Sequence, residues 1–354
     1  MNTKKNLILD ETFALAILNH QKNNLLIAKK LYSEVLKIEP NYIGALLNLG
    51  TVFNQLGEYQ EAINSYEKII VINSNNPEAY INLGIVFNNI KDFQKAINCY
   101  EKAIAINPNF TDSHYNLGNI YKKIKKYEKA INCYEKAIDI NPIYINAYNN
   151  LGILFYEIGD IKKAKDYLEK SIEIKPNSDA LNSLGTIFDR LKEYKKSINS
   201  YEKAIEISPN FIDAYNNCGQ IYDILGDYKK AITYYEKAIK INPNYLSAHF
   251  NLGNIYINLR DYQKAKNCYE KVVEINPEYV HAHGNLGVVF TLLKQYNKAV
   301  ISYEKAKKLN PNNKVNKIGY GKLLLKLNEH NKGLSSIAEG TGVIKFMQSG
   351  FKII

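Results

Sequence analysis

Apolar side chains recur at three- and four-residue spacings along most of this chain, in short runs separated by turn residues. Residues 111–144 show the pattern clearly, with one run over Tyr115–Ile124 and a second over Tyr127–Ile140. This spacing is typical of amphipathic helices. Asn141-Pro142 ends the second run, because proline has no amide hydrogen and disfavours helix in the residue before it. The stretch therefore predicts a hairpin of two short helices.

The hairpin pattern repeats along the chain with a period of 34 residues. Within 111–144, Gly118 and Ala130 are the small residues that let the two helices lie close together. The glycine recurs in register at Gly50, Gly84, Gly118, Gly152, Gly185, Gly219, Gly253 and Gly287, with one spacing of 33 after Gly152. A single hairpin cannot bury its apolar face, so neighbours must stack. The fold class predicted is therefore all-α, a solenoid with one continuous core.

The register divides the chain into consecutive repeat units of one hairpin each. Residues 1–8 are expected to be flexible, and 314–354 to form a degenerate tenth unit with a C-terminal cap and a basic tail, whose last residues alternate enough for a small hairpin. The copy at 145–177 is the weakest and is where the solenoid is expected to bend or open. Nine units lie between, at 9–42, 43–76, 77–110, 111–144, 145–177, 178–211, 212–245, 246–279 and 280–313.

The unit resembles the tetratricopeptide repeat (TPR). Counting Thr111 as position 1, the family's preferred classes are met by Leu117, Gly118, Tyr121, Ala130, Tyr134, Ala137 and Pro142, at positions 7, 8, 11, 20, 24, 27 and 32. His114 at position 4 departs from the aromatic residue that the family often has there. The resemblance implies helix hairpins wound into a right-handed superhelix. It also implies that the first helix of each hairpin lines the concave side.

Composition favours a protein partner over a nucleic acid. The formal charge is +11, but 44 of the 46 basic residues are lysine and only Arg190 and Arg260 are arginine. Arginine is the residue suited to forked phosphate recognition, so a solvated lysine surface is the favoured interpretation. The tyrosines fall at repeat positions and are expected to pack in the core.

Other residue types indicate no catalytic or metal chemistry. Cysteine and histidine show no zinc spacing, the regular glycines belong to the repeat, and the recurrent glutamate at position 25 forms a solvated helix face. We therefore expect no enzyme activity, cofactor or metal. The four cysteines form no close pair, and no run of 18 uncharged apolar residues exists. These features predict a cytoplasmic protein that does not enter membranes.

Position 6 of the first helix carries a row of asparagines, which are poor residues for a helix interior. The row is Asn48, Asn82, Asn116, Asn150, Asn217, Asn251 and Asn285, broken only by Ser183. It resembles the asparagine ladder in the repeat region of O-linked N-acetylglucosamine transferase, which implies that it holds an extended peptide by its backbone. An amide both donates and accepts hydrogen bonds, so it can bind a peptide unit whatever the side chain. We expect these amides to face solvent without a ligand.

Charge on the concave side points to neutral or basic peptides. In the TPR geometry, positions 2, 5, 6, 9, 12 and 13 face that side. Some TPR proteins clamp the acidic C-terminal peptides of heat-shock chaperones with basic residues at positions 2, 5 and 6. No lysine stands at these positions here, so that clamp is excluded. Over the eight clearer repeats, 43–313, three basic residues, Lys122, Lys123 and Arg190, stand against seven acids, Glu78, Asp112, Glu157, Asp179, Asp189, Asp213 and Asp223. Asp112, Asp179 and Asp213, at position 2, join the asparagines as expected peptide contacts.

The sequence thus predicts a non-enzymatic scaffold that binds an extended peptide or a protein surface in a groove. Two alternatives stay open. The chain could be the detached, substrate-recruiting repeat portion of a glycosyltransferase-type enzyme, acting with a separate catalytic chain. It could instead bind RNA through its surface lysines, with a steep dependence on salt.

Overall fold

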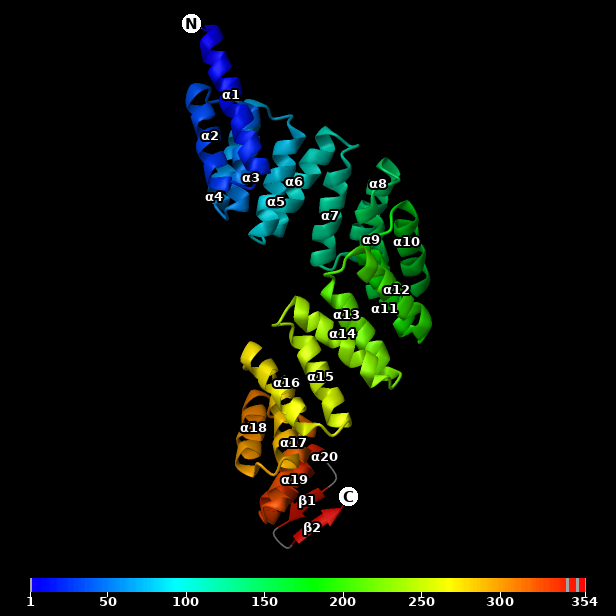
Figure 1. Ribbon diagram of the computed structural model, residues 1–354. Coiled ribbons are helices and arrows are strands. Elements are labelled where there is room, and N and C mark those ends of the chain that lie inside the picture. Colours follow the sequence, from blue (N-terminus) through cyan, green and yellow to red (C-terminus); the bar gives the residue numbers. More distant parts are fainter. Residues whose placement is uncertain (1, 342–343, 348–349, 354) are drawn as a thin grey trace. The chain divides into compact units, whose positions relative to one another are not determined.

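The structure, a computed structural model, describes residues 2–341, 344–347 and 350–353, and those residues form helices in antiparallel pairs followed by two short strands (Figure 1). The helices are α1 (Asn2–Gln21), α2 (Leu25–Ile38), α3 (Ile43–Gln55), α4 (Tyr59–Ile72), α5 (Pro77–Asn89), α6 (Phe93–Ile106), α7 (Thr111–Lys123), α8 (Tyr127–Ile140), α9 (Ile145–Glu157), α10 (Ile161–Ile174), α11 (Ser178–Arg190), α12 (Tyr194–Ile207), α13 (Ile212–Ile224), α14 (Tyr228–Ile241), α15 (Leu246–Asn258), α16 (Tyr262–Ile275), α17 (Val280–Leu292), α18 (Tyr296–Leu309), α19 (Lys314–Lys326) and α20 (His330–Thr341). The strands are β1 (Ile344–Met347) and β2 (Gly350–Ile353).

The turn inside each hairpin depends on one residue in the left-handed backbone region. Position 15 takes that conformation, as at Lys125 with φ 59° and Gly159 with φ 89°. The amide of Lys126 then donates to the carbonyl of Tyr121 at 2.8 Å, which closes the end of α7. Such left-handed caps are a common way to end a helix. This explains three of the glycines outside the position-8 register, Gly57, Gly159 and Gly226.

The turn between hairpins is built by the asparagine before the proline. The backbone amide of Asn141 donates to the carbonyl of Ala137 at 2.9 Å, while its side-chain oxygen accepts from the amide of Ile143 at 3.2 Å. Asparagine forms this local turn readily because its side chain reaches its own following backbone. The Asn-Pro pair therefore both ends the second helix and directs the chain into the next hairpin.

The position-8 glycine is where the two helices of a hairpin meet most closely. A Cβ added to Gly118 would lie 2.7 Å from Cε1 of the fully buried Tyr134. In the weakest repeat, Leu168 takes the place of the tyrosine, and a Cβ on Gly152 would lie 2.5 Å from its Cγ. No Cβ fits at either distance without a shift of the neighbouring side chain.

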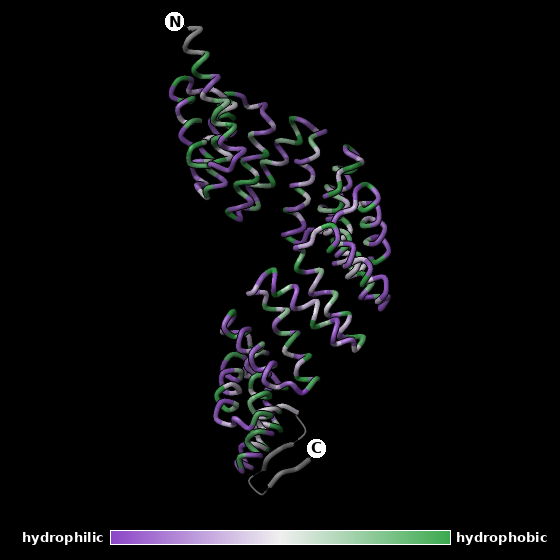
Figure 2. The backbone as a smooth tube through the Cα atoms, viewed as in Figure 1, coloured by the Kyte–Doolittle hydropathy of each residue, from purple (hydrophilic) through white to green (hydrophobic). Residues whose placement is uncertain are grey.

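The chain divides into two compact units, residues 1–175 and 176–354, at the end of the repeat that is shorter by one residue. Within each unit, second helices pack on the first helix of the next hairpin, as α6 does on α7 and α14 on α15. First helices lie side by side, with α5 beside α7 in one unit and α13 beside α15 in the other. Figure 2 shows apolar and polar residues alternating within the helices, as expected for elements with one buried face.

The two ends of the chain form different elements. Helix α1 begins at Asn2, within the segment expected to be flexible; no proline or glycine interrupts 2–21, and each added residue extends the helix by one hydrogen bond. At the other end, β1 and β2 pair antiparallel, with Ile344 opposite Ile353 and Met347 opposite Gly350. No helix in the described residues is both long and apolar enough to span a membrane.

Candidate functional site

The position-6 asparagines all lie on first helices and are all half-buried. Asn48, Asn82, Asn116, Asn150, Asn217, Asn251 and Asn285 belong to α3, α5, α7, α9, α13, α15 and α17 respectively. Because first helices are side by side within each unit, these amides form one row in residues 1–175 and another in residues 176–354. We call each of these surfaces a first-helix row.

Several of these amides are already hydrogen-bonded to the preceding repeat. Asn150 donates from Nδ2 to Tyr115 Oη at 3.1 Å and to Asn119 Oδ1 at 2.8 Å. In the second unit, the donor–acceptor pairs are Asn217–Asn182 at 3.0 Å, Asn251–Asn216 at 3.3 Å and Asn285–Asn254 at 3.2 Å. These amides join adjacent repeats. The expectation that they simply face solvent is therefore wrong for these four, because the preceding first helix presents an acceptor.

The remaining three asparagines behave differently. Asn48 donates to the carbonyl of Gly44, one turn earlier in α3, at 2.9 Å. The side-chain amides of Asn82 and Asn116 make no hydrogen bond among the residues that the structure describes. A half-buried amide without an internal partner leaves both its donor and its acceptor for a ligand. Asn82 and Asn116 are therefore the members of the row best placed to contact a peptide backbone.

The three position-2 aspartates are exposed, and two of them hold a tyrosine. The hydroxyl of Tyr144 donates to Asp112 Oδ1 at 2.7 Å, and that of Tyr245 donates to Asp213 Oδ1 at 2.7 Å. Asp179 has no such partner within the described part of the chain, because Phe211 replaces the tyrosine. Burial, and then the neighbouring Asp112, raise the pKa of Tyr144. Asp112 and Asp213 thus help to fix the end of their own repeat.

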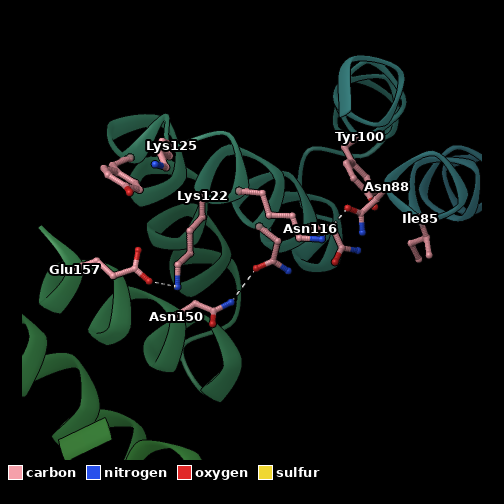
Figure 3. A pocket seen from close by; sticks show the side chains of 11 residues that line it. Ile85, Asn88, Tyr100, Asn116, Lys122, Lys125, Asn150 and Glu157 are labelled. Atoms are coloured by element: carbon pink, nitrogen blue, oxygen red, sulfur yellow. Dashed lines mark hydrogen bonds and ion pairs between the residues drawn. The ribbon is translucent and has the colours of Figure 1, made fainter. Parts of the chain in front are cut away.

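An open pocket of about 700 Å³ lies along the first-helix row of residues 1–175. Asn116 and Asn119 of α7 and Asn150 of α9 line it, together with Lys122 and Glu157. Figure 3 shows Asn116, Lys122, Asn150 and Glu157 around this opening, with the ion pair between Lys122 and Glu157 drawn. The pocket therefore combines amides that can meet a peptide backbone with charged groups that can meet side chains.

A second polar row at positions 12 and 13 was not expected from the sequence. In these repeats, each position-13 side chain meets position 12 of the preceding repeat, so the partners are 35 residues apart. The pairs are Asn89 Nδ2 to Asn54 Oδ1 at 2.9 Å, Lys123 Nζ to Asn88 Oδ1 at 2.9 Å, and Lys122 Nζ to Glu157 Oε1 at 3.1 Å. Polar residues at both positions in consecutive repeats were the signal that could have revealed it.

The same row is broken in the second unit. Asp189 and Asp223 stand at position 12, while position 13 of the following repeat offers Ile224 and Asn258. Neither aspartate has a hydrogen-bond or ion-pair partner within the described residues. Burial raises the pKa of each carboxyl group, because partial desolvation disfavours the charged form.

The acidic excess is therefore not shared equally between the units. In the repeats of residues 43–175, the expected inward positions carry three acids, Glu78, Asp112 and Glu157, against two lysines. In the repeats of residues 178–313, four acids, Asp179, Asp189, Asp213 and Asp223, stand against Arg190 alone. In addition, Lys125 extends from the hairpin turn into the lining of the pocket in the first unit. The first unit thus presents a basic pocket and the second an acidic row.

The histidines and cysteines have structural surroundings. His114, His249 and His283 at position 4 each place Nε2 2.9 Å from the carbonyl oxygen of the proline six residues earlier. The four cysteines are free, and burial raises the pKa of Cys133 to about 11 and that of Cys99 to about 12. In the part of the chain that the structure describes, no group of three or more histidine, cysteine or acidic side chains could hold a metal ion.

Two family models match the sequence. The model described as "Tetratricopeptide repeat" matches residues 77–110, 111–144, 145–178, 212–245, 247–279 and 280–313. The model described as "TPR repeat" matches residues 51–91 and 185–223. Both describe the repeat in general and do not single out the repeat region of O-linked N-acetylglucosamine transferase. No curated protein matches the chain significantly.

Two solved structures share the fold, and a third is similar in sequence over part of the chain. A tetratricopeptide repeat protein from Parabacteroides merdae is 19% identical with a TM-score of 0.55, covering 71% of this chain and 99% of that chain. The pilF protein of Pseudomonas aeruginosa is 19% identical with a TM-score of 0.54, covering 61% of this chain and 97% of that chain. MamA is 34% identical with a TM-score of 0.41, covering 45% of this chain and 94% of that chain.

The repeat register, the stacked helix hairpins and a family model that matches more than half of the residues agree with one another. The chain belongs to the tetratricopeptide repeat family, whose repeats build scaffolds for protein–protein interaction.

Proposed function

We propose that this protein is a scaffold that binds an extended peptide segment of a partner along its first-helix rows. The observation that carries the proposal is the asparagine row itself, above all Asn116, whose amide lines the pocket without an internal partner. An amide that both donates and accepts can pair with successive peptide units. Neighbouring asparagines that are already hydrogen-bonded between repeats hold the row in place for such a ligand.

Charge complementarity assigns a preference to the second unit. Asp189 and Asp223 are half-buried carboxylates without a cationic partner among the described residues, and Asp179 is exposed on the same row. A lysine or arginine of the ligand would supply the missing charge and offset the desolvation of these groups. In residues 176–354, the preferred ligands are therefore extended peptides that are neutral to basic.

The test is peptide binding before and after removal of amides. We expect Asn116→Ala to weaken the binding of peptide-array hits while leaving the melting temperature unchanged, since Asn116 has no internal partner in the described structure. Asn150→Ala should weaken binding and also lower stability, because it removes two hydrogen bonds to the preceding repeat. Asn132→Ala is the matched control, because Asn132 is exposed on the second helix α8.

Two results would contradict the proposal. Unchanged peptide binding by the Asn116→Ala variant would remove the amide row from the site. RNA binding stronger than peptide binding, with a steep loss of affinity as salt rises, would instead support recognition through the lysine surface. Retention of a glycosyltransferase chain in a pull-down would support the role of a substrate-recruiting subunit.

A further inference from the structure

The pocket on the first unit differs in charge from the rest of its row. Three lysines line it, Lys122 and Lys123 from the end of α7 and Lys125 from the turn that follows, against the single carboxylate of Glu157 on α9. These lysines stand at positions 12, 13 and 15, so they belong to a different part of the helix from the positions of the excluded chaperone clamp. An open cavity with this lining favours a negatively charged ligand.

The pocket already contains one lysine–carboxylate ion pair of the kind that an acidic ligand would form. Lys122 Nζ lies 3.1 Å from Glu157 Oε1, with 22% of the lysine side chain and 40% of the glutamate side chain exposed. Lys123 donates only to the neutral oxygen of Asn88, at 2.9 Å. Neither Lys123 nor Lys125 has a carboxylate partner within the described residues. Two of the three ammonium groups are thus without an opposite charge.

We propose that this pocket binds an acidic side chain, glutamate or aspartate, of the extended segment held by the first-helix row. The inference rests on the proposed function and names the ligand chemistry of one unit. Separate carboxylates of the ligand meet Lys123 and Lys125, while its backbone lies against the amide of Asn116. The same chain therefore receives an acidic part of its partner on residues 1–175 and a neutral to basic part on residues 176–354.

The lining favours a peptide over a nucleic acid. No arginine lines the pocket, and the wall between the lysines carries asparagine amides that match peptide units in donor and acceptor. Two tyrosines line the pocket: Tyr100 is 1% exposed and offers no face on which a base could stack, whereas Tyr127 is half-buried. The lysine ammonium groups can pair with an acidic side chain of a peptide, while the neighbouring amides hydrogen-bond to its backbone.

Glu157 competes with the ligand in this arrangement. Its carboxylate is paired with the ammonium group of Lys122. Among the described residues, only Lys123 and Lys125 of the three lysines therefore lack a carboxylate partner that a ligand would have to displace. Replacing Glu157 with glutamine removes one negative charge from the wall and releases Lys122. The proposal therefore predicts that Glu157→Gln, although it removes a polar contact at the site, increases the affinity for an acidic peptide.

The experiment measures binding of labelled peptides to the full chain by fluorescence anisotropy at low and moderate salt. The probe is a capped octapeptide of alternating glutamate and serine, with matched versions carrying glutamine or lysine in place of glutamate. We expect Glu157→Gln to tighten binding of the glutamate peptide by about threefold, and Lys123→Gln with Lys125→Gln to weaken it by about tenfold, as expected for contacts near a protein surface. Lys162→Gln, on the exposed face of α10, is the matched control and should leave the affinity unchanged.

Each alternative outcome has a distinct meaning. Equal binding of the glutamate and glutamine peptides, or no gain for Glu157→Gln, overturns the inference but leaves the proposed function standing. Absence of binding by all three peptides overturns both. Tighter binding of a single-stranded RNA octamer than of the glutamate peptide, lost in the Lys123→Gln and Lys125→Gln variant, overturns the choice of a peptide ligand. A gain of affinity cannot arise from misfolding, so the Glu157→Gln result is decisive.

Discussion

At the scale of single residues, the buried tyrosines at position 24 show how one neighbour decides whether a polar group is satisfied. The hydroxyl of Tyr134 donates to Asn119 Oδ1 at 2.8 Å, and that of Tyr269 donates to Asn254 Oδ1 at 2.6 Å, in both cases at position 9 of the same repeat. In the repeat of the fully buried Tyr235, position 9 is Gln220 instead, and the Tyr235 hydroxyl has no acceptor in the described structure. The longer glutamine side chain is exposed.

Gln220→Asn should therefore stabilise the protein. The shorter amide can accept from Tyr235 as its counterparts do, and a satisfied buried hydroxyl contributes about 1 kcal/mol to the free energy of unfolding. Chemical denaturation of the two proteins measures the difference. Tyr235→Phe in the Gln220→Asn background is the control, because the gain should disappear once the hydroxyl is absent. A gain that survives this control would mean that helix propensity, and not the hydrogen bond, is responsible.

The unpaired carboxyl group of Asp223 predicts a dependence on pH. Burial raises its pKa in the folded state, so folding favours the protonated form and stability is lost as pH rises through the range of the carboxyl group. Asp223→Asn should consequently raise the melting temperature at pH 7 by about 1–2 °C, a small effect because the group is half-exposed.

The advantage of the Asp223→Asn variant should shrink towards pH 3, where the native carboxyl group is protonated in both states. Thermal unfolding followed by circular dichroism across this range gives the measurement. Asp166→Asn on the exposed face of α10 is the comparison and should show no such convergence. If the two variants behave alike, the burial of Asp223 has no energetic consequence.

At the scale of helices, the residue that caps the N-terminus varies between second helices, while the helix length does not. Asp160 accepts at Oδ1 from the backbone amide of Lys163 at 3.0 Å, which satisfies one of the free amides at the start of α10. The equivalent residue before α8 is Lys126, which makes no side-chain cap. Both helices are nevertheless 14 residues long, because packing of the apolar face, and not the cap, determines their extent.

Lys126→Asp should add the missing cap. The new carboxylate would accept from the backbone amide of Lys129, as Asp160 does from Lys163, and such a cap contributes about 1 kcal/mol to stability. Unfolding in urea tests this directly. Lys126→Ala is the matched variant, since it removes the same charge without supplying an acceptor. Equal stability of the two variants would show that the position is insensitive to capping.

The positions of the helices could be predicted from the sequence, but many of the side-chain hydrogen bonds between them could not. The apolar run Tyr127–Ile140 coincides with α8, because periodicity records which face is buried. The left-handed turn at Lys125 has no sequence signal, unlike Gly159, since lysine does not indicate positive φ. The asparagine row was visible, whereas the bond from Asn150 to Asn119 depends on a residue 31 positions earlier that periodicity alone does not select.

At the scale of the whole chain, each unit has its own core, formed by contacts between neighbouring helices. The core of residues 176–354 includes Tyr235, Tyr269 and Tyr303, each packed among helices of its own and adjacent repeats. In such an architecture, stability is approximately the sum of the repeats and the interfaces between neighbours. A lesion should therefore remain near its site instead of spreading along the chain.

Gly152→Leu tests this expectation at the tightest contact of the weakest repeat. A Cβ at Gly152 already lies 2.5 Å from Leu168 Cγ and 3.2 Å from the carbonyl oxygen of Ala164, so a larger side chain must separate α9 from α10. Such overpacking costs about 1–3 kcal/mol. Hydrogen exchange followed by mass spectrometry should show faster exchange in residues 111–175 and unchanged protection beyond the adjacent repeat, 178–211.

Lys162→Leu introduces the same side chain on the exposed face of α10 and should leave exchange unchanged throughout. Because α9 and α10 pack mainly on each other and on α8, and not on the described helices from α13 onward, protection in those later helices is the sensitive readout. Uniform loss of protection over all repeats in the Gly152→Leu variant would show that the solenoid unfolds as one cooperative body. Loss confined to 111–211 would show that the damage stays within the substituted repeat and its sequence neighbours, as packing between neighbouring repeats requires.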